Sequence, residues 1–168
     1  SDARSRTVEM LAAFYSIVTK RPMGVKERNV IGAAVSMLDR HDDVPVLRDL
    51  RELIRTGPEE LRLVAGTEGG ASYGAVIDEL DSALLAMMRP DGPISDVFAG
   101  QTSVSMKRDR PTVYDVSSIK DTESDLQAAA LLACWSNGFA AVNYHHLLAD
   151  AGLEDRRHHF LVMDELWR

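Results

Sequence analysis

The sequence predicts a mainly α-helical protein with a small parallel β portion. Through residues 1–90, apolar residues recur at helical intervals, which is typical of helices that bury one face. Beyond them, two short apolar runs with β-branched and aromatic residues, 111–116 and 160–163, flank one long helical pattern. Two strands joined by a helix run parallel with a right-handed crossover, so these runs predict a strand–helix–strand unit.

The helices of the first ninety residues are separated by residues that end or start a helix. Pro22 and Gly24 interrupt the first apolar stripe, and Gly57 followed by Pro58 ends one helix and begins another. The helices are expected over residues 7–19, over residues 26–39, after Pro45 as far as Gly57, in a short segment from Pro58, and over residues 73–89.

The composition changes after residue 90, and we expect two domains, 1–90 and 91–168. Proline, glycine and serine recur from Asp91 to Arg110, where residues 103–106 alternate like a short strand. Residues 124–148 then form the long helical pattern between the two predicted strands. The all-α part would therefore precede a smaller part that contains the sheet.

Composition and charge exclude several classes of protein. The formal net charge is −7, which disfavours binding of nucleic acid over the whole surface but leaves a local basic groove open. The single cysteine, Cys134, has no disulfide partner in the chain and agrees with a reducing compartment. No apolar run approaches the roughly 20 residues of a membrane helix, and no signal peptide is visible. The chain begins with Ser1, not Met, and ends soon after an apolar run, which suggests a piece of a larger protein.

Three carboxylates are expected at one edge of the predicted sheet. Asp115 lies near the end of the first strand, and Asp164 and Glu165 follow the second. The carboxyl ends of parallel strands meet at the edge where open α/β folds bind ligands. An apolar strand followed by Asp-Glu is the pattern of a Walker B motif, in which Asp164 would hold the water shell of Mg²⁺ and Glu165 would deprotonate the attacking water. The alternative is that these acids only cap a strand.

The residues around these acids resemble one family. The order of three features resembles the motor ATPases of conjugation and type IV secretion, which are RecA-like. These features are Tyr114-Asp115-Val116-Ser117, then a helix rich in alanine and leucine, then Asp164-Glu165-Leu166-Trp167. Residues 92–102 are similar to the turn that precedes the first of these strands in that family. The resemblance implies a helical subdomain plus part of a RecA-like P-loop NTPase core that ends at the Walker B motif.

The same resemblance implies a function and a setting. The parent protein would be a hexamer of copies of this chain that binds Mg²⁺ and ATP, contacts secretion-channel components, and moves DNA or protein cargo. It would be cytoplasmic, at the inner face of the cell membrane. Glu165 would be the catalytic base and Asp164 the magnesium acid. Asp115 and Ser117 would lie close by and bind or sense the γ-phosphate.

The chain departs from the family because it has no Walker A loop. No Gly-x-x-x-x-Gly-Lys-[Ser/Thr] occurs, and the glycine-rich residues 66–74 lack the lysine that contacts phosphates, so they predict a loop between helices. We therefore expect the chain alone to be inactive and its parent to be the ATPase. The alternative is a self-contained helical module that binds other proteins and has no catalytic activity.

The remaining polar residues predict no further site. The pairs His145-His146 and His158-His159 lack the spacing of metal ligands, and Cys134 is expected to be a small core residue. A group of arginines follows helical spacing; it predicts a solvent-exposed face, with contact to DNA or a neighbouring subunit as the alternative. Its members are Arg48, Arg51, Arg55 and Arg62.

Overall fold

The computed structural model describes residues 2–40, 43–67, 72–104 and 110–163, and their regular structure is helical throughout. The helical periods therefore predicted the right elements, with ends that differ by a few residues from those expected. The helices are α1 (Asp2–Thr19), α2 (Val25–Leu38), α3 (Leu47–Thr56), α4 (Glu59–Val64), α5 (Tyr73–Met87) and α6 (Ser124–Asp150).

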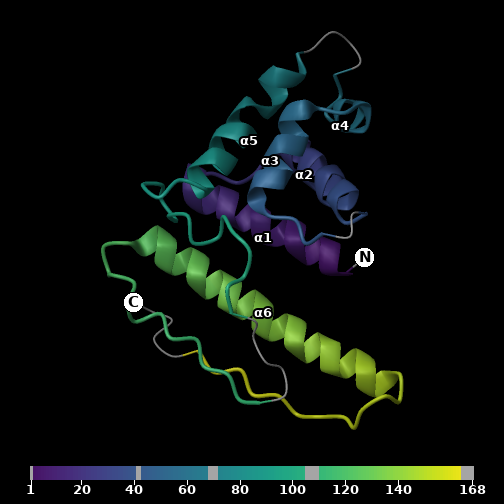
Figure 1. Ribbon diagram of the computed structural model, residues 1–168, viewed down its shortest axis with the longest axis vertical. Coiled ribbons are helices and arrows are strands. Elements are labelled where there is room, and N and C mark those ends of the chain that lie inside the picture. The colour runs from purple at the N-terminus through teal and green to yellow at the C-terminus, as the bar shows by residue number, and fades with distance from the viewer. Residues whose placement is uncertain (1, 41–42, 68–71, 105–109, 164–168) are drawn as a thin grey trace.

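One apolar core joins the helices, with α1 at its centre. Helix α1 packs against α2, α5 and α6, while α2 also contacts α3 and α4, and α3 packs on α5 (Figure 1). Each helix contributes the face that carries its apolar stripe, because burying that face is what stabilises an amphipathic helix in water. The largest fully buried side chains are Tyr15, Val30, Ile31, Ile54, Leu61, Leu80, Leu84, Met87 and Ile94.

Helix α3 begins and ends through local chemistry that the sequence carries. The carboxylate of Asp49 accepts a hydrogen bond of 2.8 Å from the backbone N–H of Val46 at the start of the helix. At the other end, Gly57 has a φ of +58°, the left-handed conformation that favours glycine after a helix. Pro58 precedes α4, whose first turn is acidic, as suits the positive end of a helix dipole.

The prediction of a small parallel β portion and a RecA-like core is wrong for the described residues, which contain no strand or sheet. Residues 111–116 and 160–163 are non-helical and form no strand, and several of their apolar side chains are open to solvent. Val113 is 89% exposed, Phe160 92% and Val162 87%. A strand is stabilised by pairing with neighbouring strands and by burial of one face. With no strand beside them among the described residues, and with much of their apolar surface exposed, these segments lack that support. Of residues 103–106, the described Ser103 and Val104 are not in a strand either.

Residues after position 90 contribute to the same core as the first five helices. Ile94 is fully buried, and the ring of Phe98 lies 4.9 Å from that of Phe14 on α1. Ala129 on α6 is also fully buried. One core thus takes side chains from both residues 1–90 and residues 91–168. The division into two domains at this boundary stays a prediction.

Helix α6 is the longest helix, with 27 residues. Within the described parts of the chain, neither it nor another helix combines the length and apolar character needed to cross a membrane.

Candidate functional site

Asp115 and Ser117 form a tight turn on the surface. The backbone N–H of Ser117 donates a hydrogen bond of 2.9 Å to Oδ1 of Asp115, and both side chains are exposed. Hydrogen bonds from the Ser117 hydroxyl and backbone N–H hold the pKa of Asp115 below its ordinary value, because they favour the ionised carboxylate. The turn lies on the surface and not at the edge of a sheet, where Asp115 was expected, and the roles assigned to the two residues stay predictions.

Tyr114 ties this turn to the middle of α6. Its hydroxyl donates a hydrogen bond of 3.0 Å to Oδ1 of Asn137. Partial burial raises the pKa of the Tyr114 hydroxyl, and nearby Cys134 raises it further. Burial likewise raises the pKa of the Cys134 thiol, which keeps it protonated and weakly nucleophilic at neutral pH. Cys134 is thus a partly buried packing residue, close to the role expected of it.

The segment that precedes the predicted acid pair also lies against the middle of α6. We name residues 152–163 the C-terminal arm; it turns back along α6 after the helix ends (Figure 1). An ideal Cβ on Gly138 would lie 3.1 Å from Cδ2 of Leu161, so the arm passes close to the helix at this glycine. Asp164 and Glu165 themselves lie outside the described residues.

The described residues do not assemble a metal site. Among them, no three His, Cys, Asp or Glu side chains gather in a way that could hold an ion. Asp115 offers one exposed carboxylate, and a lone carboxylate with a hydroxyl neighbour does not replace the several oxygen ligands that Mg²⁺ prefers. Asp164, the predicted magnesium acid, lies outside the described part of the chain.

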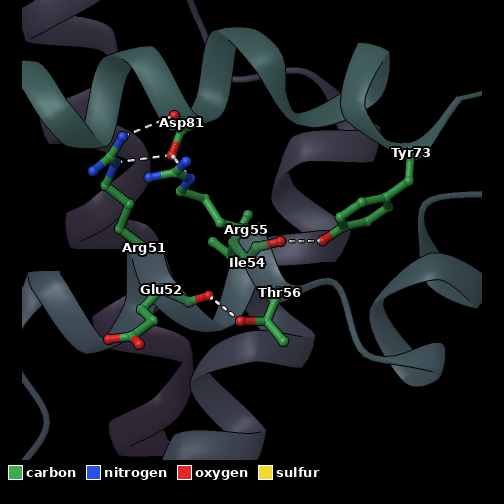
Figure 2. Close-up of polar contacts among 7 residues, drawn as sticks. All are labelled: Arg51, Glu52, Ile54, Arg55, Thr56, Tyr73 and Asp81. Carbon is green, nitrogen blue, oxygen red and sulfur yellow. Dashed lines mark hydrogen bonds and ion pairs between the residues drawn. The ribbon is translucent and has the colours of Figure 1, made fainter.

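Two of the predicted surface arginines are paired between helices. Nη2 of Arg51 on α3 donates a hydrogen bond of 3.0 Å to Oδ2 of Asp81 on α5, and its Nε lies 2.8 Å from Oδ1 (Figure 2). Nε of Arg55 lies 3.9 Å from the same Oδ1. The Arg51 and Asp81 side chains are only 20% and 25% exposed, so this pair belongs to the α3–α5 contact. Arg51 is therefore not part of a solvated basic face, whereas Arg48 remains exposed.

The end of α3 is held by a second polar group, which also uses an arginine. The hydroxyl of Tyr73 donates a hydrogen bond of 2.8 Å to the carbonyl of Ile54 (Figure 2). Nε of Arg62 donates a hydrogen bond of 2.6 Å to the carbonyl of Gly57, and its guanidinium lies 5.8 Å from the centre of the Tyr73 ring. Burial raises the pKa of the Tyr73 hydroxyl, so it remains a donor at neutral pH. Arg62 thus satisfies a free carbonyl of the helix end.

A cavity of about 420 Å³ lies between α1, α2, α3 and the segment around Phe98. Its lining is mainly apolar, and an ion pair of 2.6 Å between Arg4 and Asp39 lies at its rim. The volume is within the range of small-molecule pockets. None of Asp115, Ser117 or the arm residues lines it.

A group of histidines that the arm brings onto α6 was not predicted from the sequence. Nδ1 of His145 lies 3.1 Å from Oε2 of Glu154, and the His145 ring stacks on that of His159 with 5.2 Å between ring centres. A signal for this group was present: the two His-His pairs lie on either side of Gly152, a residue suited to reversing the chain after a helix.

No family model matches the chain, and neither a curated protein nor a solved structure matches it significantly.

Proposed function

We propose that this chain is part of an ATP-hydrolysing motor that powers conjugative DNA transfer or type IV secretion. The pattern of Tyr114-Asp115-Val116-Ser117 and Asp164-Glu165-Leu166-Trp167 supports the proposal. The observation that carries it is that both motif-bearing segments run to one place on α6. Tyr114 bonds to Asn137, and Leu161, three residues before Asp164, lies against Gly138.

The roles within the motor follow from the chemistry of the side chains. MgATP would be the substrate: Asp164 would hold the water shell of its magnesium ion, and Glu165 would accept a proton from the attacking water. Asp115 stays ionised at neutral pH because Ser117 donates hydrogen bonds to it, so both can orient water or phosphate oxygens. Since the sequence has no Walker A loop, the phosphate-binding loop comes from elsewhere in the motor.

The motor assembles as a ring of copies, meets secretion-channel components, and works at the cytoplasmic face of the membrane. These features are part of the same proposal and rest on the resemblance alone. DNA and protein cargo are both consistent with a net charge of −7, since the cargo contacts a local surface and not the whole chain.

The proposal is tested by the ATPase activity of the full-length protein that contains this chain, with Glu165→Gln as the test variant. The wild type is expected to hydrolyse ATP only with magnesium, and the variant is expected to bind nucleotide but not to turn it over. Glu52→Gln is the matched control, because Glu52 is an exposed glutamate on α3 and its carboxylate points away from the drawn polar contacts (Figure 2).

Either of two results would reject the proposal. ATP turnover by the Glu165→Gln protein at the wild-type rate would show that Glu165 is not the catalytic base. Absence of both nucleotide binding and hydrolysis in the wild type would remove the motor function altogether.

A second candidate, a helical module that binds another protein, is favoured by a separate observation. The helical core is compact, whereas the apolar side chains of Val113, Phe160 and Val162 are uncovered. If these side chains lie together, they form the kind of apolar surface that a partner covers. This candidate expects a chain that binds no nucleotide and whose C-terminal arm resists limited proteolysis once the partner is bound.

A further inference from the structure

The C-terminal arm is held to α6 by a small number of contacts. Gly152 has a φ of +69°, and the chain reverses there, with the N–H of Leu153 bonded to the carbonyl of Leu148 at 2.9 Å. From Gly152 to Leu161 most residues are exposed, so the arm buries little surface of its own. An element with so few buried contacts opens at a low cost in free energy, and its docking is sensitive to each contact.

His145 is the centre of these contacts. It is 7% exposed, and it is the one buried residue of α6 apart from Ala129. Its Nδ1 faces the carboxylate of Glu154 on the arm, and its ring meets the ring of Tyr144 edge-on. The arm therefore covers a titratable side chain that would otherwise lie on an exposed part of the helix.

A second imidazole from the arm lies on the first. The rings of His145 and His159 are stacked, with 5.2 Å between their centres and 30° between their planes, and the ring of His146 lies 6.0 Å from that of His159. Glu154 is the carboxylate that bonds to this group, and Nη2 of Arg157 lies 3.8 Å from the same carboxylate oxygen. A positive charge on His159 would lie close to Arg157 and to the neighbouring imidazole rings, so protonation of His159 adds repulsion to the docked state.

We propose that the C-terminal arm is an acid-sensitive latch, docked on α6 through the stack of His145 and His159 while His159 is neutral and released when His159 is protonated. The groups that face the stacked rings are Tyr144 and His146 from α6, and Glu154, Arg157 and His158 from the arm. Glu154 is the one carboxylate among them, whereas Arg157 and the neighbouring imidazoles oppose a positive charge on His159.

The direction of the pH effect follows from His159. Burial lowers its pKa from the ordinary 6.5, and the neighbouring His145, His146, Arg157 and His158 lower it further. A basic group whose pKa is lowered on docking favours the docked state at high pH. That contribution is present above 6.5 and is lost as the pH falls through the lowered pKa. Acid therefore releases the arm.

The test is an NMR titration of the chain between about pH 7.5 and about pH 5, the range over which histidine changes charge. The backbone amide of Gly138 is the reporter, because the Leu161 side chain lies against this residue only when the arm is docked. We expect a cross-peak between the His145 and His159 rings at the higher pH, its loss at the lower pH, and a concerted shift of the Gly138 resonance.

Two variants separate protonation from packing. His159→Phe keeps an aromatic ring in the stack but cannot take a proton, so its Gly138 resonance is expected to stay at the docked position throughout. His158→Gln keeps the stack and removes only the smallest of the influences that lower the His159 pKa, so this variant is expected still to release the arm in acid, with the transition at the same or a slightly higher pH.

The proposal is overturned if the wild-type Gly138 resonance does not move, or if the His159→Phe chain responds to pH as strongly as the wild type. An undocked Gly138 resonance in His159→Phe at the higher pH would equally overturn it, because the stack would then not hold the arm. The inference does not depend on the proposed motor function, since none of these measurements involves nucleotide.

Discussion

Gly57 is a position where one added methyl group tests how α3, α4 and α5 are held together. Its φ of +58° disfavours any residue with a Cβ, and the left-handed conformation costs alanine about 1 kcal/mol. An ideal Cβ would also lie 2.6 Å from Cε1 of Tyr73, so the ring must move. Moving it breaks the 2.8 Å hydrogen bond from the Tyr73 hydroxyl to the Ile54 carbonyl, worth about 1 kcal/mol, and the contact with Arg62, worth about 0.5 kcal/mol.

Gly57→Ala is therefore expected to lower the free energy of unfolding by about 2.5 kcal/mol, which is large beside the roughly 5–15 kcal/mol of a typical domain. Chemical denaturation followed by far-UV circular dichroism measures this change. In a Tyr73→Ala background the ring is absent, so Gly57→Ala should cost only the backbone part, about 1 kcal/mol. The double-mutant cycle then gives a coupling of about 1.5 kcal/mol.

An equal cost of Gly57→Ala in both backgrounds would refute the reasoning, because the tyrosine ring would then not be the obstacle. A cost near zero in the Tyr73→Ala background would refute the backbone part as well.

Two further changes probe α5 and α6. Asp81→Ala leaves Arg51 partly buried without its partner and should lower the free energy of unfolding, measured by denaturation, by about 2 kcal/mol. The control Asp78→Ala, at an exposed position of α5, should lower it by less than about 0.5 kcal/mol. Equal costs for the two variants would contradict the α3–α5 pairing. Gly138→Ala should stabilise α6 by up to about 1 kcal/mol because alanine has the higher helix propensity. The added methyl group should also crowd Leu161, so limited proteolysis should cleave the arm faster than in the wild type. Slower cleavage would argue against the close approach of Leu161 to Gly138.

The helices could be predicted because their signals are local. The stripe of Tyr73, Ile77, Leu80, Leu84 and Met87 repeats within one segment, and in the structure Ile77, Leu80, Leu84 and Met87 are buried. A helix forms its backbone hydrogen bonds within itself, so the pattern of a single segment contains most of the information about it.

The strands could not be predicted reliably from the same kind of pattern. Residues 111–116 and 160–163 have the composition of buried strands, but a strand exists only when another segment supplies its hydrogen-bond partners. Composition does not show whether that partner is present. The described chain leaves Val113 and Phe160 exposed instead.

The roles of the candidate site residues stay predictions, but the local contact between two of them has a physical reason in the sequence. That Asp115 and Ser117 lie together follows from their separation by one residue and from the tendency of aspartate to bond to the backbone two residues on. The histidine group could not be predicted from the spacing of histidines in the sequence, because His145 and His159 come together only through the chain reversal at Gly152.

Helix α6 is anchored at one end and extends beyond its anchor. Its contacts with the core lie in its first half, through Leu126, Ala129 and Ala133, and Lys20 at the end of α1 pairs with Asp125 at 2.5 Å. The part that follows Ala133 is about 25 Å long at 1.5 Å per residue. A rotation of about 10° at the anchor would therefore displace the far end by about 4 Å, by simple leverage over that helical length. The helix can convert a small rearrangement at α1 into a movement as wide as a side chain at the place where the arm is attached.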